Sequence, residues 1–475
     1  MTCTKSNHAR QQRFQTFGDE TLQNVLENFA DGFPRKRAAA ISRLDEFDDL
    51  RDAARDIKNH VLANLDTYLT RFEERVLENG GQVHWCRDAA EACQTILEIC
   101  QAANARTVTK SKSMIGEEIA INDFLERHDI EPVETDLGEY IIQLREEPPS
   151  HIIAPAIHLS KEQVAETFVE KHTDRDPDRT LTEPRVMLDE ARAELRGKFL
   201  GADVGLTGAN MLVSETGSIA TVTNEGNADL TMGLPRVHVA LASIEKIVPT
   251  LEDASTILRV LARSATGQEM SVYTTFATGP KRSDDLDGPE QFHVVLLDNG
   301  RSELLGSEFQ DILRCIRCGS CINHCPVYST VGGHAYGWVY PGPMGSVLSP
   351  ALIGLEDAHH LPNASTLCGK CETVCPMHIP LPRMLRSWRT RQVEQNLQAA
   401  TSRYGLELWA FMAKRPRLYR VFSAMASRVL RMMAGKNARI RWLPLGGGWT
   451  SKRDMPAPQG PTFMSQWKQN RDRYS

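Results

Sequence analysis

Seven cysteines crowded into one central stretch constrain this chain more than any other feature of its sequence. The first four have the spacing Cys315-x2-Cys318-x2-Cys321-x3-Cys325, followed at once by Pro326. In such a run, three thiolates hold one cubane iron-sulfur cluster, while the fourth cysteine reaches a second cluster. Thiolates are soft ligands that suit iron, and the proline lets the chain turn away. A zinc ribbon also uses Cys-x2-Cys pairs but needs no such run of four, so the spacing predicts iron-sulfur clusters.

A second motif, Cys368-x2-Cys371-x3-Cys375, repeats the last three positions of the first, and Ser365 stands where its first cysteine would be. If the two motifs exchange one ligand each, the clusters have separate sets of thiolates. The first set is Cys315, Cys318, Cys321 and Cys375, and the second is Cys325, Cys368 and Cys371. We expect two 4Fe-4S clusters, the second completed by Ser365, by solvent or by a cysteine from elsewhere. The alternative for the second set is a three-iron 3Fe-4S cluster.

The sequence contains no run of about 20 apolar residues that could span a bilayer, and its first thirteen residues are polar. These features predict a cytoplasmic protein, in which cysteines rarely form disulfides. The cysteines outside the two motifs are therefore expected to be ordinary small apolar or surface residues. They are Cys3, Cys86, Cys93 and Cys100.

Upstream of the cysteines, segments with strand character alternate with amphipathic helical segments. This alternation predicts an α/β domain with a largely parallel sheet. Strands are expected at residues 82–85, 106–110, 132–134, 151–157 and 292–297, with strand and turn character over 201–223. Helices are expected at residues 50–76, from residue 88 onward, at 116–128, within 160–200 and at 307–313.

The 475 residues are enough for about three domains, preceded here by a helical region. We expect an N-terminal helical region at residues 1–80 and the α/β domain at 81–300. An α-helical ferredoxin-like domain with two clusters follows at 301–390, and a basic helical segment ends the chain at 391–475.

Small and polar side chains stand at several expected strand ends, where open α/β sheets bind ligands. They are Thr207, Asn210, Glu215 and Thr216. Lys110 and Lys112 could supply positive charge for a carboxylate, and Glu215 is the candidate for acid-base catalysis. The alternative is that these residues only make turns. No dinucleotide or P-loop glycine motif is present, so any flavin or nicotinamide is expected on another protein.

The chain is strongly basic near its end, with 16 Lys and Arg against 2 Asp and Glu at residues 383–453. One helical face there is apolar, formed by Leu418, Val421, Phe422, Met425, Val429 and Met432. Residues 404–441 are therefore a candidate for peripheral contact with the inner face of a membrane. The alternative is a helix packed on its own domain with solvated arginines. No nucleic-acid motif accompanies the charge, so we expect no nucleic acid as a partner.

Several motifs together resemble the lactate-utilisation iron-sulfur protein (LutB) family. They are Cys315–Tyr328, Gly332–Gly345 (GGHAYGWVYPGPMG) and Leu367–Pro382, with Lys110–Met114 (KSKSM), Glu134–Tyr140 (ETDLGEY), Glu215–Ser218 (ETGS) and Asn224–Asn227 (NEGN) upstream. The likeness continues through Arg441–Trp442 and Trp449–Trp467 and so covers nearly the whole chain. Ser365 is a departure, since some members have cysteine there.

This resemblance implies a LUD domain with the fold of sugar-phosphate isomerases and CoA transferases. It also implies a three-protein system that oxidises L-lactate to pyruvate. In that system this chain would pass electrons between a cysteine-rich electron-transfer protein and a second LUD-domain protein. A rival hypothesis is a LUD-domain enzyme that acts directly on a 2-hydroxy acid, a 2-keto acid or an acyl group, with accessory clusters. A relay serving another 2-hydroxy acid is the third possibility.

Overall fold

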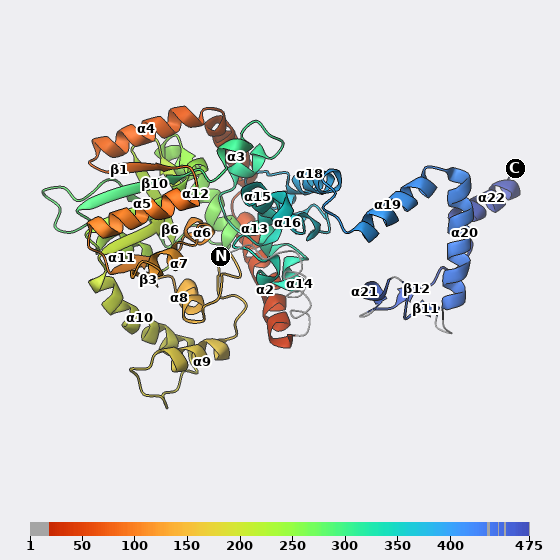
Figure 1. Cartoon of the computed structure of the whole chain (residues 1–475), viewed down its shortest axis with the longest axis horizontal. Helices are drawn as coiled ribbons and strands as arrows, with labels where there is room; N and C mark the ends of the chain where they lie inside the picture. Colours follow the sequence, from red (N-terminus) through yellow and green to blue (C-terminus); the bar gives the residue numbers. More distant parts are fainter. Residues whose placement is uncertain (1–18, 435–437, 445, 451–452, 475) are drawn as a thin grey trace. The chain divides into compact units, whose positions relative to one another are not determined.

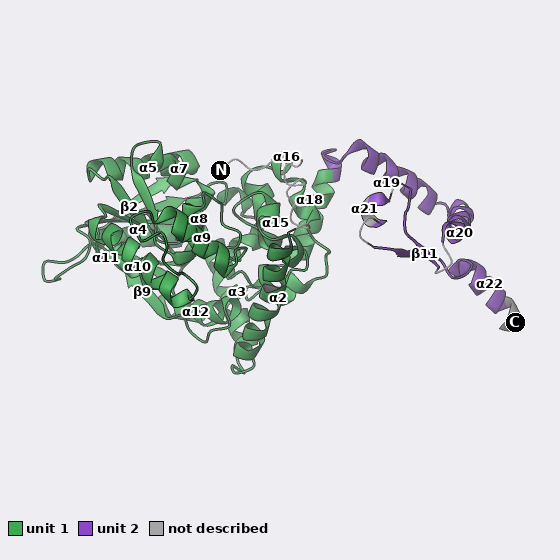
Figure 2. Cartoon of the chain, turned by 90° about the horizontal axis from the view of Figure 1, so that it is seen from below, with its two compact units in different colours: residues 1–392 green, residues 393–475 purple. Residues whose placement is uncertain are grey.

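The computed structural model describes residues 19–434, 438–444, 446–450 and 453–474. The chain divides into two compact units, residues 1–392 and 393–475 (Figure 2). The first unit contains both the α/β sheet and the two cysteine motifs. A ligand site on the sheet and the cysteine sites therefore belong to one compact body.

A six-stranded, wholly parallel sheet forms the centre of the first unit (Figure 1). In spatial order its strands are β1 (Gln82–Cys86), β10 (Gln291–Leu297), β7 (Val237–Ser243), β4 (Val204–Gly208), β2 (Thr107–Lys110) and β3 (Glu131–Glu134). Every residue of β7 is buried, because a central parallel strand is covered on both faces. The predicted parallel α/β fold is confirmed.

Two apolar clusters hold the layers on either side of this sheet. One contains residues of α5 (Ala89–Ala102), α6 (Met114–Glu118) and α7 (Ile121–Glu126). The other contains residues of α4 (Leu65–Glu78), α11 (Asn227–Gly233) and a second sheet. The second sheet has the order β8 (Ile247–Val248), β5 (Met211–Val213), β6 (Ser218–Thr223) and β9 (Tyr273–Ala277). The carboxyl ends of the parallel strands therefore open at one edge between two covered faces.

Side-chain caps fix where several helices begin. The Asp88 carboxylate accepts a hydrogen bond from the backbone N–H of Glu91 at the start of α5, where the sequence predicted a helix from residue 88 onward. Asp136 accepts from two backbone N–H groups at the start of α8 (Leu137–Leu144). Two further helices complete this part of the fold, α9 (Lys161–Lys171) and α10 (Pro184–Gly201).

The strand predicted at residues 151–157 is wrong, because this stretch forms turns. The Nδ1 atom of His151 accepts hydrogen bonds from the backbone N–H groups of Ile153 and Ala154. The N–H of Ser150 donates to the carbonyl of Pro155. These bonds close a loop in place of a sheet ladder.

Three predicted helices also differ from the structure. The helix expected from residue 50 to 76 is divided at Asn64 into α3 (Phe47–Ala63) and α4. The helix expected at 116–128 is divided at Ala120, whose φ of 53° is left-handed and therefore interrupts the helix. At 307–313 the chain forms a short 3-10 helix instead, η3 (Gln310–Arg314). The helical spacing of apolar residues continues across such short breaks, so the sequence pattern did not reveal them.

The cysteine segment consists of short helices joined by tight turns. They are α13 (Ser320–Asn323), α14 (Tyr328–Val331), η4 (His334–Tyr336), α15 (Gly342–Leu352), α16 (Leu355–Ala358), η5 (Leu361–Asn363), α17 (Lys370–Thr373) and α18 (Leu381–Glu394). Phe309, ahead of this segment, stacks on Trp388 of α18 with ring centroids 4.0 Å apart. This contact joins the two ends of the segment, as expected of an aromatic pair in a core.

The N-terminal helices α2 (Glu20–Ile41) and α3 link the cysteine segment to the α/β layers. Both helices contact α12 (Leu251–Ala265), and α2 also contacts α13 and α14. Arg37 of α2 donates to the carbonyl of Val374, and Arg51 of α3 donates to the carbonyl of Cys375. The first two helices therefore help to hold the second cysteine motif in place.

The second unit contains two long helices, α19 (Ala400–Ala413) and α20 (Pro416–Met433), described from end to end. It also contains the short antiparallel pair β11 (Arg439–Ile440) and β12 (Met455–Pro456), with α21 (Gly447–Thr450) and α22 (Phe463–Tyr474). No residue of α19 or α20 is buried. Among the described residues, no helix is long and apolar enough to cross a membrane.

A buried network of charges joins the α/β layers to the segment that leads into the cysteines. The Arg301 guanidinium donates to both oxygens of Glu118, over 3.0 and 2.7 Å, and lies 3.1 Å from Glu245. Tyr340 donates to Glu118 over 2.6 Å, and Arg317 lies 3.6 Å from Glu245. Further elements of this region are η1 (Ile244–Lys246) and η2 (Ser302–Leu304). The two acidic and two basic groups balance one another inside the fold.

Replacing Arg301 tests this network. The substitution Arg301→Leu leaves Glu118 and Glu245 buried without their main partner, so we expect a loss of about 3–5 kcal/mol in the free energy of unfolding. Thermal unfolding followed by circular dichroism would show it as a lowered midpoint. Arg282→Leu is the control, because Arg282 is exposed and should change stability by less than about 0.5 kcal/mol. Equal midpoints for the two variants would contradict the role of the network.

Candidate functional site

The two cysteine motifs share the same local backbone. Cys318 and Cys368 each lie between two residues with positive φ. The angles are 58° at Arg317, 71° at Gly319, 54° at Leu367 and 82° at Gly369. Left-handed backbone is costly for a residue other than glycine, so it marks loops that their surroundings hold in place. The repeat seen in the sequence is therefore also a repeat in structure.

Each cysteine thiol affects the pKa of its neighbours, and these effects follow two groups among the seven cysteines. Burial raises the pKa of the Cys318 thiol, and the nearby Cys375 and Cys315 raise it further. Burial likewise raises the pKa of Cys371 to about 12, with added contributions from Cys325 and Cys368. The pKa of Cys321 is raised more by Cys315, Cys318 and Cys375 than by Cys371. These influences follow the two sets of the crossed spacing, and the division of the seven ligands between two clusters stays a prediction.

The donor chemistry of these groups fits iron-sulfur clusters. Thiolates at close quarters repel one another and stay deprotonated only when a cation neutralises them. Backbone N–H groups supply further support, since the N–H of Arg317 lies 3.4 Å from the Cys315 sulfur. Within the described residues, no three His, Cys, Asp or Glu side chains are arranged to hold one metal ion. The two groups are defined by the effects of their thiols on one another's pKa values. The first group has four thiols, the number of ligands that a cubane cluster needs.

The predicted second group has three thiols, and Ser365 precedes the first cysteine of the second motif in the sequence. The Ser365 oxygen accepts a hydrogen bond from the N–H of Leu367, and Arg389 donates to the Ser365 carbonyl. Ser365 is thereby held on the loop that leads to Cys368, which is exposed. Ser365 remains a candidate for the fourth ligand.

The other described cysteines lie in the core of the α/β sheet. Cys86 ends β1, while Cys93 and Cys100 lie on α5, and all three belong to one apolar cluster. Burial raises the pKa of Cys93 to about 11 and that of Cys100 to about 12, so these thiols stay protonated. They are the small apolar residues that the sequence predicted. Cys3 lies outside the described residues.

Cationic side chains surround the first group of thiols. Arg37 and Arg51 donate to carbonyls of the loop around Cys375, and Arg314 donates to the carbonyl of His378. Burial lowers the pKa of Lys58 to about 8 and that of Lys246 to about 8, and the nearby Cys315 opposes both shifts. Positive charge near the thiolates offsets the negative charge of a thiolate-bound cluster.

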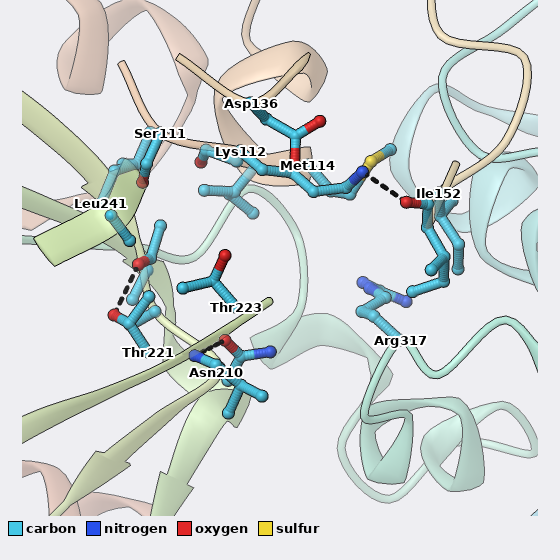
Figure 3. A pocket seen from close by; sticks show the side chains of 18 of the residues that line it. Ser111, Lys112, Met114, Asp136, Ile152, Asn210, Thr221, Thr223, Leu241 and Arg317 are labelled. Atoms are coloured by element: carbon cyan, nitrogen blue, oxygen red, sulfur yellow. Dashed lines mark hydrogen bonds between the residues drawn. The ribbon is translucent and has the colours of Figure 1, made fainter. Parts of the chain in front are cut away.

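A cavity of about 260 Å³ opens between the carboxyl edge of the sheet and the first cysteine loop (Figure 3). Lys112 follows β2, Asp136 follows β3 and Asn210 follows β4. Arg317 enters from the opposite side. Its guanidinium lies 4.8 Å from the ring centroid of Tyr340, which also lines the cavity. The carboxyl ends of parallel strands meet at one edge, which explains why residues far apart in sequence gather here.

The structure brings two of the six predicted ligand-binding residues to this cavity, Lys112 and Asn210. Lys110 is buried elsewhere, with its Nζ atom 2.7 Å from both Glu117 and Glu134. The Thr207 hydroxyl is 2.8 Å from the His238 ring and does not line the cavity.

Glu215 and Thr216 lie on the turn between β5 and β6, outside the cavity. The Glu215 side chain is exposed and accepts a hydrogen bond from the N–H of Leu251 at the start of α12. The Thr216 hydroxyl is 2.8 Å from that of Ser218. Their surroundings are those of a turn and a helix cap.

Lys246, Arg317 and Tyr340 line the cavity although sequence reasoning did not select them. Lys246 comes soon after β7, so the rule that strand ends bind ligands could have identified it. Arg317 stands between two cysteines of a cluster motif, and that motif carries no signal about the role of the arginine side chain. Only the fold reveals that this arginine faces the sheet.

Comparisons with known proteins agree with this architecture. Residues 69–297 match the LUD domain, residues 311–379 match a 4Fe-4S dicluster domain, and residues 382–472 match the C-terminal domain of lactate utilisation protein B. The chain is 43% identical to lactate utilization protein B of Bacillus cytotoxicus over 436 residues, which cover 92% of this chain and 91% of that protein. It is 40% identical to the Bacillus subtilis protein of the same name over 464 residues, 96% of this chain and 95% of that one.

A third relative is the uncharacterized electron transport protein YkgF of Escherichia coli, with 40% identity over 466 residues, 96% of this chain and 95% of that protein. The chain belongs to the lactate utilization protein B family.

Proposed function

We propose that this protein carries electrons through two iron-sulfur clusters during the oxidation of L-lactate to pyruvate by a multi-protein system. The observation that carries the proposal is that both cysteine motifs, with seven thiols between them, lie within one compact unit. When bound, each such cluster would accept and donate one electron at a time. The name shared by these relatives supports lactate as the substrate of the system. We place the protein in the cytoplasm, with a cysteine-rich electron-transfer protein and a second LUD-domain protein as partners.

The two groups have different surroundings, and this difference suggests a direction through the protein. In the first group, Cys318 and Cys375 are buried and basic residues lie near them. In the second group, Cys368 is exposed at the surface. We assign the second group to electron exchange with a partner protein and the first to the interior side of the relay. Ser365 or solvent would complete the second group as a 4Fe-4S cluster, while an open corner there would give a 3Fe-4S cluster.

Serine substitutions test how the cysteines are divided between the clusters. Because Cys375 belongs with the first motif, Cys375→Ser and Cys318→Ser should weaken the same EPR signal of the reduced protein. Cys325→Ser should weaken the other signal, together with Cys371→Ser. Cys86→Ser is the control, since Cys86 lies in the sheet core and should leave about eight irons per chain. A common signal for Cys318→Ser and Cys325→Ser would contradict the crossed division.

The rival function is catalysis by the LUD domain itself, with Glu215 as the acid-base residue. The exposure of Glu215 and its role at the start of α12 favour the relay instead. In the assembled system, we expect Glu215→Gln to keep lactate-dependent reduction of an electron acceptor within about twofold. Cys318→Ser should lower it by about a hundredfold or more, since the relay would be interrupted. The reverse pattern would support the rival.

The second unit supports a further proposal, peripheral contact with an anionic membrane through residues 404–441. Leu418, Val421 and Met425 of α20 are exposed along one face, with Arg420, Arg428 and Arg431 elsewhere on the helix. An amphipathic basic helix of this kind binds the interface of anionic bilayers. The exposed apolar face favours this reading over a helix packed within its own unit.

Vesicle sedimentation tests this contact. We expect the full-length protein to bind vesicles of phosphatidylglycerol and phosphatidylethanolamine, and Val421→Asp with Met425→Asp to weaken binding by about tenfold or more. Ser423→Asp with Ala424→Ser is the control, because position 423 lies on the opposite face of the same helix. If the protein does not sediment with anionic vesicles, the basic helices serve another purpose.

A further inference from the structure

The cavity of Figure 3 lies directly against the first cysteine loop. Arg317 lines it and stands in sequence between Cys315 and Cys318, two of the four thiols of the first group. Both the sheet and this loop belong to the first unit. A molecule in the cavity would therefore sit beside the first cluster.

Three cationic side chains line this cavity, namely Lys112, Lys246 and Arg317. Arg317 lies 3.6 Å from Glu245 and so belongs to the balanced charge network around Arg301. Lys112 donates to the carbonyl of Ile153 over 2.8 Å and lies 3.5 Å from Glu139. Burial raises the pKa of Glu139 well above its usual value, which disfavours a full negative charge beside Lys112.

Lys246 is the third cation of the cavity. In the described part of the chain, its ammonium has neither a hydrogen-bond partner nor an ion-pair partner, although the residue is half-buried. An unpaired ammonium that has lost part of its water favours a bound anion as its partner.

Two carboxylates also line the cavity, and both have structural partners. Asp136 accepts hydrogen bonds from the N–H groups of Gly138 and Glu139 at the start of α8. Glu225 is exposed and accepts from the N–H of Leu137. They hold the loop after β3 in place, and they restrict the cavity to an anion of low charge.

Neutral hydrogen-bonding groups complete the lining. The Asn210 side-chain oxygen accepts from the N–H of Val222, which fixes the amide and leaves its nitrogen to donate. Figure 3 shows this nitrogen on the side of the cavity where Arg317 enters. A volume of about 260 Å³ is slightly below the roughly 300–1,000 Å³ of sites for drug-sized ligands, which favours a small molecule.

We infer that this cavity binds a small organic monocarboxylate that carries a hydroxyl or keto oxygen, held by Lys246, Arg317 and Lys112 with Asn210 donating to the second oxygen. This inference deepens the proposed electron-transfer function and rests on it for the cluster. Carboxylates are recognised by buried lysine and arginine through charge-assisted hydrogen bonds. The site belongs to the LUD domain and the cysteine loop together.

Binding and reduction are coupled in this arrangement. An electron added to the first cluster places one more negative charge near the bound carboxylate. Coupling between two neighbouring sites typically changes a binding constant by about 5- to 150-fold. Because linkage is reciprocal, the carboxylate lowers the reduction potential by the corresponding amount. The oxidised protein therefore binds the anion more tightly than the reduced protein.

Calorimetry on the anaerobically purified full-length protein, loaded with its clusters, tests the inference. L-lactate, pyruvate and inorganic phosphate are titrated into the oxidised and the dithionite-reduced forms. We expect lactate or pyruvate to bind the oxidised form about tenfold more tightly, and to shift the EPR spectrum of only one cluster. Phosphate binding as tight as that of the carboxylates would overturn the assignment to a carboxylate. Intact clusters without carboxylate binding would also overturn it.

Matched variants locate the binding. Lys246→Gln should weaken carboxylate binding about tenfold or more while keeping both cluster signals. Lys370→Gln is the control, because Lys370 precedes Cys371 as Arg317 precedes Cys318, yet it does not line the cavity. Asn210→Ala serves as a second variant and should weaken binding without removing a charge. Equal affinity in the native protein, Lys246→Gln and Asn210→Ala would overturn the site, whereas missing cluster signals in the native protein would instead contradict the proposed function.

Discussion

The buried charge network around Arg301 is the interaction on which the arrangement of the two candidate sites depends. It joins Glu118 of α6 and Glu245 of η1, both in the α/β layers, to the segment that enters the cysteine loop. Buried ion pairs often contribute little net stability, since desolvation offsets their attraction. Their geometric demands are strict, however, because a buried charge without its partner costs several kcal/mol. The network therefore fixes position more than it adds stability.

Arg317 shows what this fixed position achieves. Its guanidinium lies 4.8 Å from the ring centroid of Tyr340, while Tyr340 donates to Glu118. The arginine is thus held by a ring that is itself anchored in the network, and its left-handed backbone is supported by the same contacts. One side of this residue faces the sheet cavity, and its backbone N–H faces the sulfur of Cys315. A single residue therefore belongs to both sites.

The sequence predicted the sheet because its strands have a strict pattern of burial, and the equally strict cysteine spacing is the basis for the predicted grouping of the thiols. The buried run of β7 and the repeated cysteine intervals leave few other arrangements. The cavity was predicted only in part, because strand ends indicate an edge and not which side chains turn inward. Lys110 ends β2 and is held by Glu117 and Glu134, while Lys112, two residues later, leaves the strand and lines the cavity. The contribution of Arg317 comes from another part of the chain and could not be seen before the fold was known.

The surroundings of the two thiol groups differ in a way that bears on where an electron rests. Near the first group, charges such as Arg37 and Arg51 lie in an interior of low polarity, where Coulomb attraction is strong. Near the second group, Cys368 is exposed and Lys370 is surrounded by water, so its charge is screened. Added negative charge is therefore favoured more at the first group than at the second. An anion in the neighbouring cavity opposes this preference, because it brings negative charge to Arg317, which stands on the loop of the first group. The energy difference between the two groups then depends on whether the cavity is filled, which gives the α/β domain a physical means of influencing electron flow without taking part in a covalent step.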